Sequence, residues 1–414
     1  MRKIVIFILI GFPLHLTLAQ VGHSLQFRGQ ASAWTNFNPG NDLPLWFGGR
    51  YLPELHYVLE SSEKPVFDIE LSAHLNGLAG MKFPDSLDAE GRLKPYRAWI
   101  RYTTSKMEIR LGMQKINFGS ANMLRPLMWF DQVDPRDPLQ LTDGVWGILG
   151  RYYFLNNANI WLWGLYGNKE LKAWEFSTTS ERTPEFGGRV QLPVPRGEMA
   201  MTYHHRKSDF DLQAAGADHF LKNIKNLQPT GDLLYNTWTY DCTFMPISSR
   251  DADKYQRLPE NRIGIDAKWD LGPGIWTEGT WTGQRNLPGI LQHQHLLNVG
   301  VDYTFALGNG LYMAFEQLLM AFGERIMQFD TSVYFSALSA SYHLSLSDHI
   351  TAIIYRDWTN KNQYHFLNYQ RKYNKLSFYV MAFLNPDIVS LPQQSEAVKL
   401  FSGKGLQFMI VYNH

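Results

Sequence analysis

The sequence predicts an all-β fold, a transmembrane antiparallel up-and-down β-barrel of about 18 strands. Two observations predict it. Runs of about ten residues alternate between apolar and polar side chains along most of the chain, and the connections between these runs are alternately short and long. A third observation, an apolar N-terminal segment with a cleavage motif, indicates export from the cytoplasm.

The N-terminal segment has the organisation of a secretory signal peptide. Arg2 and Lys3 precede an apolar stretch, and Thr17-Leu18-Ala19 places small residues at the usual cleavage positions. We therefore predict residues 1–19 as a signal peptide, cleaved after Ala19 or Gln20, and residues 20–414 as one barrel domain. An apolar first strand is the alternative interpretation of the same stretch.

Composition excludes several classes of protein. The chain has 414 residues, of which 45% are hydrophobic, so it can bury a core. Its 39 Lys and Arg nearly balance its 38 Asp and Glu, which gives no reason to expect a nucleic-acid partner. Cys242 is the only cysteine, so neither an internal disulfide nor a multi-cysteine metal site can form. We expect no metal and no cofactor.

The segment 66–76 illustrates the alternation. Phe67, Ile69 and Leu71 share one face, and the charged or polar residues between them share the other. Comparable runs begin near Ser24, Phe47, Pro65, Leu93, Lys106, Gly144, Ala158, Phe186, Gly197, Asn261, Gly274, His295, Leu311, Ser332, His349, Gln363, Lys375 and Gly405.

Every second connection between these runs is predicted to be short. The short ones are 61–64, 103–105, 155–157, 193–196, 272–273, 307–310, 345–347 and 373–374; the long ones are 38–46, 78–91, 120–143, 168–185, 207–259, 285–294, 324–331, 358–362 and 386–404. This pattern predicts hairpins with tight turns at one end and elaborated loops at the other.

Nothing in the sequence would cover the apolar faces of these strands with protein, because helical patterns are scarce. Lipid would cover them. In hydrocarbon a sheet must close so that every backbone group is paired. Together with the signal peptide, this predicts the outer membrane of a Gram-negative bacterium, with outer-membrane lipid and lipopolysaccharide as surroundings.

The C-terminal residues alternate in the same way, with Leu406, Phe408, Ile410 and Tyr412 on one face. This resembles the terminal strand through which outer-membrane proteins reach the barrel assembly machinery, although His414 stands where the usual residue is Phe. The chain resembles the porin-like superfamily of barrels with 16 to 18 strands. Its size is similar to that of the sugar-acid exporters and specific porins, and its signal resembles those of Bacteroidetes.

In porins the third external loop folds inward and sets acidic residues against a basic wall, and the resemblance implies the same for 120–143. This loop is unusually apolar and carries three prolines. The predicted constriction residues are Arg125, Asp131, Asp134, Arg136 and Asp137 from the loop, and Arg97, Arg101, Arg110 and Arg151 from the flanking strands. Alternatively, these arginines only pin the loop to the wall.

The longest predicted loop, 207–259, is expected outside the cell and could cap the pore. No Gly-x-Ser-x-Gly, His-Glu-x-x-His or phosphate-loop motif occurs, so we do not expect an enzyme. The adjacent His204 and His205 would face opposite sides of a strand and could not share a metal.

We therefore expect a porin-like channel for passive diffusion of small hydrophilic solutes through a water-filled lumen that the third loop narrows. The alternative is a closed barrel that acts as an adhesion or secretion scaffold through its outer loops. Porins often form trimers, and the sequence leaves a homotrimer open.

Overall fold

The computed structural model describes residues 21–61, 66–82, 86–209, 257–284, 292–386 and 400–414. The predicted signal peptide, Cys242 and most of the predicted loop 207–259 lie outside these residues. The described strands are β1 (Val21–Phe37), β2 (Leu45–Ser61), β3 (Val66–Lys82), β4 (Ser86–Thr103), β5 (Met107–Gln114), β6 (Val145–Tyr153), β7 (Asn159–Tyr166), β8 (Thr178–Thr179), β9 (Pro184–Val194), β10 (Gly197–Asp209), β11 (Leu258–Asp270), β12 (Gly274–Gln284), β13 (His293–Phe305), β14 (Leu311–Gly323), β15 (Thr331–His343), β16 (Asp348–Asp357), β17 (Asn362–Lys372), β18 (Leu376–Leu384) and β19 (Lys404–Asn413).

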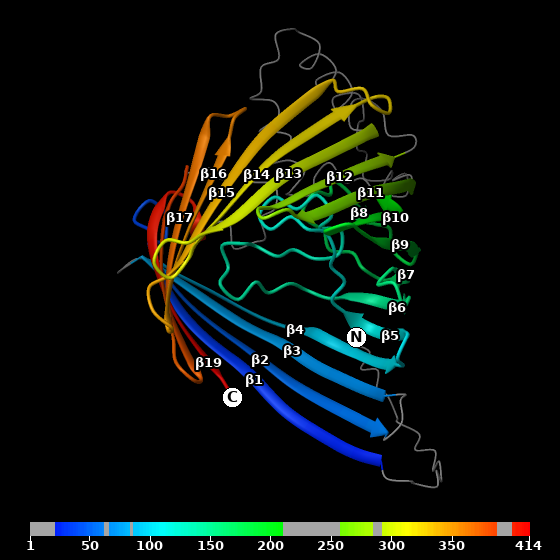
Figure 1. Cartoon of the computed structure of the whole chain (residues 1–414). Helices are drawn as coiled ribbons and strands as arrows, with labels where there is room; N and C mark the ends of the chain where they lie inside the picture. The colour runs from blue at the N-terminus through cyan, green and yellow to red at the C-terminus, as the bar shows by residue number, and fades with distance from the viewer. Residues whose placement is uncertain (1–20, 62–65, 83–85, 210–256, 285–291, 387–399) are drawn as a thin grey trace, which may run out of the picture.

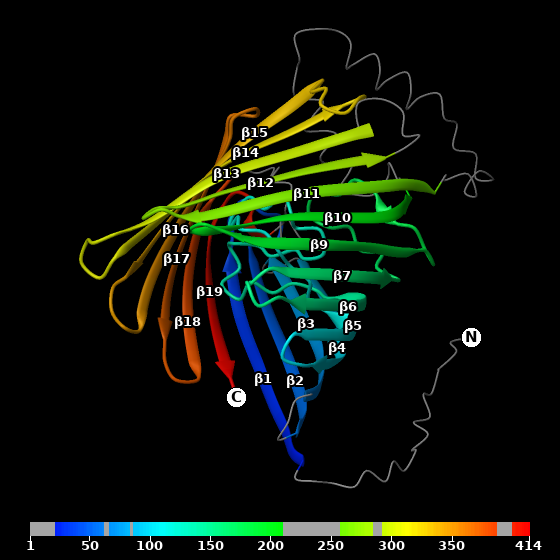
Figure 2. The same ribbon diagram turned by 45° about the vertical axis from the view of Figure 1, so that its right-hand side comes forward.

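These strands form one closed antiparallel sheet (Figures 1 and 2). Successive strands pair along the chain, and β19 pairs with β1 from Gln30↔Asn413 to Phe37↔Leu406. The two-residue β8 stands outside this ring, because β7 pairs directly with β9 and β8 pairs only with β10. The described ring therefore has 18 strands, as the sequence predicted. Among the described residues, no helix is long and apolar enough to span a membrane.

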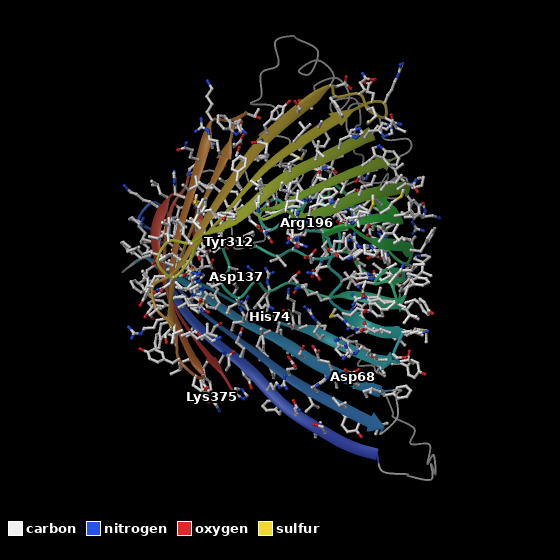
Figure 3. The ribbon with its side chains drawn as sticks, viewed as in Figure 1. Asp68, His74, Asp137, Arg196, Tyr312 and Lys375 are labelled. Atoms are coloured by element: carbon white, nitrogen blue, oxygen red, sulfur yellow. The ribbon has the colours of Figure 1, made fainter. Side chains whose placement is uncertain are left out.

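The two faces of the sheet carry different side chains. Large apolar residues such as Leu71, Leu162 and Phe408 are 50 to 65% exposed on the outer face. In water such a surface would be unstable, whereas in a bilayer it contacts acyl chains. Charged residues between them, such as Asp68, point to the concave inner side (Figure 3). The alternation predicted from the sequence is therefore the division between the outside and the inside of the barrel.

The predicted strand starts lie within three residues of the described ones, except that β4 begins at Ser86 and not near Leu93, so one predicted loop is wrong. Residues 78–91 are mostly strand: β3 and β4 pair continuously from Gly77↔Gly91 to Lys82↔Ser86. The stretch contains glycine, aspartate and glutamate, which favour loops. On the barrel wall Asp88 and Glu90 occupy inner positions together with Gly80, and Gly91 is on the outer face opposite Gly77, so the hairpin continues.

The C-terminal residue joins the outer aromatic surface. His414 exchanges backbone hydrogen bonds with Gly29 at 3.0 and 3.2 Å. Its ring stacks on Tyr51 and Tyr412 with centroids 5.9 Å away, and lies 5.5 Å from Phe27. Histidine thus occupies an aromatic environment here in place of the usual phenylalanine.

A charge on the outer face should destabilise the barrel. We expect Leu162→Arg, in the middle of β7, to lower the free energy of unfolding by about 2–4 kcal/mol, because the guanidinium would enter hydrocarbon. Denaturant unfolding in lipid vesicles measures this, with Leu162→Ile as the control. An equal stability of the two variants would contradict a lipid-facing outer surface.

Candidate constriction inside the barrel

The chain between β5 and β6, residues 115–144, turns into the space that the strands enclose (Figures 1 and 2). We call it the inserted segment. Leu124 and Met128 are 2% and 1% exposed, and they pack with inward side chains such as Trp276 and Leu318 of β12 and β14. The apolar residues that made this loop unusual in the sequence are therefore buried against the inner wall.

Two wall carboxylates hold the backbone of the inserted segment. Glu278 of β12 accepts hydrogen bonds from the backbone N–H of Ser120 and, at 2.7 Å, of Ala121. Glu316 of β14 accepts from the next three N–H groups, those of residues 122–124, at 2.6, 3.1 and 2.6 Å. Neither carboxylate has measurable exposure. Hydrogen bonds to charged acceptors are the stronger ones, so these five anchor the segment firmly.

The chain reaches these carboxylates through Gly119, whose φ is +100°. A Cβ at this position would collide with the carboxylate of Glu278, and the positive φ is itself unfavourable for other residues. Asn298 of β13 completes the anchor, because its amide nitrogen donates to Leu124 O at 2.5 Å and to Glu316 at 3.1 Å.

A second cluster holds the middle of the inserted segment against β7 and β10. Phe130 lies edge-on to Trp163 and to His204, with centroids 5.5 and 5.0 Å away. The imidazole of His204 accepts from Trp163 Nε1 and binds Glu185 through Nε2, each at 3.2 Å. His205 instead contacts Asn261 on the outer face. The prediction that the two histidines face opposite sides is confirmed.

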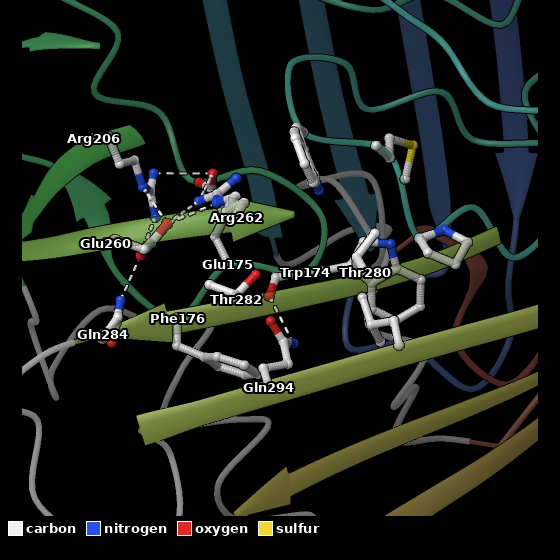
Figure 4. Close-up of a pocket in the computed structure, with 14 residues that line it drawn as sticks. Trp174, Glu175, Phe176, Arg206, Glu260, Arg262, Thr280, Thr282, Gln284 and Gln294 are labelled. Carbon is white, nitrogen blue, oxygen red and sulfur yellow. Dashed lines mark hydrogen bonds and ion pairs between the residues drawn. The ribbon is translucent and has the colours of Figure 1, made fainter. Parts of the chain in front are cut away.

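Residues 167–183, between β7 and β9, form a second inward segment, and the sequence analysis missed it. Trp174 is 6% exposed and donates from Nε1 to Arg125 O at 2.6 Å. Glu175 pairs with Arg206 at 2.9 Å and Arg262 at 2.7 Å (Figure 4). Both arginines also bind Glu260, through Nε at 2.7 Å. The cavity between these side chains is about 20 Å³, room for about one water molecule.

The predicted acidic residues of the inserted segment do not face the predicted arginine wall. Asp131, 1% exposed, pairs with Arg125 at 2.7 Å, and Asp134 pairs with Arg136 at 2.7 Å. These pairs lie within the segment and stabilise its own conformation.

Asp137 reaches the wall, but at a different arginine. Its carboxylate lies 3.8 Å from Arg50 of β2. Burial raises the pKa of Asp137, and the Arg50 guanidinium offsets this only in part. Acidification should therefore neutralise Asp137 at a higher pH than an exposed aspartate.

The end of the inserted segment is held by β4. Arg97 donates from Nη2 to Thr142 O at 2.8 Å, and Lys94 binds Asp143 at 2.5 Å. Burial opposes ionisation of Asp143, but the hydrogen bond and charge of Lys94 outweigh it and lower the pKa. Of the four predicted wall arginines, Arg97 hydrogen-bonds to the described part of the inserted segment, and it holds the loop to the wall.

The other three predicted arginines form a separate basic cluster on β4, β5 and β6. Arg101, Arg110 and Arg151 lie 3.7, 3.1 and 3.6 Å from the single carboxylate of Glu108. Their side chains stay 31, 14 and 17% exposed, whereas those of the Arg125–Asp131 pair are 9 and 1% exposed. We call these three residues the arginine cluster.

Two carboxylates and two aromatic rings contact the arginine cluster. Arg101 also binds Asp68 at 2.5 Å, and Arg110 and Arg151 lie over the rings of Trp99 and Trp161 at 4.7 and 3.9 Å. Arg101 and Arg110 are directly opposite in register, an arrangement that costs stability because like charges repel. The cluster thus gives the inner wall a basic, partly solvated surface.

Neither a protein-family model nor a curated protein matches the sequence. Solved structures match the fold. OccD3 (OpdP) of Pseudomonas aeruginosa aligns over 94% of this chain and 91% of its own, at TM-score 0.53 and 9% identity. OccAB4 of Acinetobacter baumannii aligns over 95% and 98%, at 0.51 and 6%. An anion-selective porin from Comamonas acidovorans aligns over 95% and 100%, at 0.45 and 11%.

The fold is that of an outer-membrane porin barrel. These likenesses identify no subfamily within it. The predicted fold class is therefore confirmed, and the roles of individual residues depend on the geometry described above.

Removing the charge of the wall carboxylates should loosen the inserted segment. We expect Glu278→Gln and Glu316→Gln to increase hydrogen exchange at the amides of residues 120–124 by at least about tenfold, because each charge-assisted bond contributes about 1.5–3 kcal/mol. Exchange measured by mass spectrometry reports this, with the exposed Glu324→Gln as control. Unchanged exchange in both variants would show that packing alone holds the segment.

Proposed function

We propose that this chain is a passive outer-membrane channel for small hydrophilic solutes. Its signal peptide, residues 1–19, is removed on export, and residues 20–414 form the barrel. The inserted segment and residues 167–183 occupy part of the lumen and narrow the passage. The proposal rests above all on the arginine cluster, whose partly exposed charges line the inner wall.

The sequence led us to expect aspartates of the loop opposite arginines of the wall, and the charges that narrow the passage are arranged differently. The aspartates of the inserted segment are engaged by Arg125, Arg136 and Arg50. The three guanidinium groups of the arginine cluster outnumber the two carboxylates that bind them, Glu108 and Asp68. A narrow aqueous passage lined by net positive charge favours anions over cations. We therefore infer that small organic or inorganic anions pass more readily than cations of the same size.

Conductance tests the channel itself. We expect the purified, refolded protein to give discrete conductance steps in a planar bilayer, and proteoliposomes to swell with sugars and organic acids below a size limit. A stable barrel with no steps would contradict the open channel and favour the closed scaffold with adhesion or secretion functions. Deleting residues 212–254 then distinguishes the two, since only a scaffold that binds through this region would lose its partner.

Charge selectivity tests the arginine cluster. We expect Arg110→Gln and Arg151→Gln each to shift the reversal potential under a KCl gradient toward that of a cation-preferring channel, because each removes one lumenal charge. Arg371→Gln is the matched control, since Arg371 is on the outer face with its side chain 50% exposed. An equal reversal potential in all variants would remove the arginine cluster from the selectivity mechanism.

The C-terminal strand is the feature that bears on how the barrel is assembled. We propose that β19, which pairs with both β18 and β1, delivers the chain to the barrel assembly machinery. The homotrimer that porins often form stays a prediction, which native mass measurement in detergent checks.

A further inference from the structure

Two histidines six positions apart meet on the inner face of the β15–β16 hairpin. His343 is directly opposite His349, and their ring centroids are 4.5 Å apart with the ring planes at 23°. Both share a face with Ser341 and Thr351, whose hydroxyls hydrogen-bond at 3.0 Å. The pair therefore lies at the short-turn end of the barrel, on the side of the lumen.

The backbone geometry brings these two side chains unusually close. Leu344 N donates to Asp348 O at 2.9 Å, so the pair next to the histidines is the hydrogen-bonded one. His343 and His349 consequently occupy a non-hydrogen-bonded position, where Cα atoms are about 4.5 Å apart and side chains approach most closely. Two imidazoles at such a position can reach one ion together by rotating about their side-chain torsions.

A polar side chain of the neighbouring strand borders the pair. Gln370 of β17 is directly opposite His349, and its amide nitrogen donates to Tyr379 Oη of β18 at 3.0 Å. This bond turns the Gln370 amide toward β18, so it is not counted as a ligand. Within the described ranges, no three His, Cys, Asp or Glu side chains converge on a metal position. The donor set is accordingly the two imidazole nitrogens, completed by water.

We propose that His343 and His349 bind one divalent transition-metal ion, such as Cu²⁺, Ni²⁺ or Zn²⁺, at the short-turn rim of the lumen. Neutral imidazole is the commonest ligand for these ions. His343 is exposed and His349 partly exposed, so an ion reaches both from water. Cu²⁺ binds most tightly of the three, following the general order of affinity for nitrogen ligands.

Calorimetric titration of tag-free, EDTA-treated protein in detergent tests this with CuCl₂, NiCl₂ and ZnCl₂. At pH 7.5 we expect one ion per chain, and His343→Gln or His349→Gln should each weaken binding by at least about tenfold. Both substitutions lie beside an exposed turn, so the barrel should fold, which circular dichroism checks. His365→Gln, on the outer face of β17, is the matched control and should bind as the parent does.

Electron paramagnetic resonance of the Cu²⁺ complex gives a signature that a structural role would not produce. We expect coupling to two nitrogen nuclei, reduced to one in either variant, and loss of binding at pH 5, where imidazoles are protonated. The proposal is overturned if the parent binds no ion at millimolar concentration, or if both variants bind as tightly as the parent. The rings would then serve only as a stacked pair that stabilises the hairpin.

Discussion

Closure of the sheet by pairing β1 with β19 is the constraint on which the rest of the structure depends. Residues 30–37 and 406–413 pair over eight positions, so neither terminal strand is left as an open edge within that span. In hydrocarbon an unpaired backbone group costs several kcal/mol. Once the sheet is closed, each side chain faces either lipid or the lumen. Because successive residues of a strand point to opposite faces, alternating apolar and polar residues satisfy both environments. The short apolar and polar repeats in the sequence are a direct result.

The lumen has two different walls. The inner faces of β14–β19 carry apolar and aromatic side chains, including Phe322, Tyr364 and Met381, all buried. Such faces cannot line open water without cost, and they are covered by the chain's own inward segments. The opposite wall, from β2 to β6, is charged. The inserted segment packs on the apolar wall and on two carboxylates, and Arg50, Lys94 and Arg97 hold its second half to the charged wall. The arginine cluster stays partly solvated.

The strands were predictable because their signal is local. Alternation within about ten residues fixes a strand and its lipid face, and every predicted start has a counterpart in the barrel. Residues 78–91 were misinterpreted because glycine and acidic residues favour turns when read without their pairing partners. The contacts of the inserted segment could not be predicted, since Asp131 had several arginines within plausible reach. Glu278 and Glu316 lay at inward strand positions, but only the fold shows that they bind backbone.

Longer-range relations were invisible for the same reason. His343 and His349 are brought together by the exact register of one hairpin, and the sequence drew attention instead to the adjacent His204 and His205. The connection predicted at 168–185 was expected as an ordinary loop, and no local sequence pattern indicates that Trp174 hydrogen-bonds to Arg125. Strand register determines which residues of neighbouring strands lie opposite each other, and the period of the sequence pattern does not specify the register.

The unequal strand lengths have a consequence for the shape of the barrel rim at the end with the long connections. β4 has 18 residues and β6 has 9, a difference of nine residues or about 30 Å of extended chain. Pairing between β4 and β5 begins only at Ala98, so residues 86–97 of β4 extend beyond the end of β5. The rim at this end is therefore uneven in height, and both inward segments leave the barrel wall from its low side, after the short strands β5 and β7.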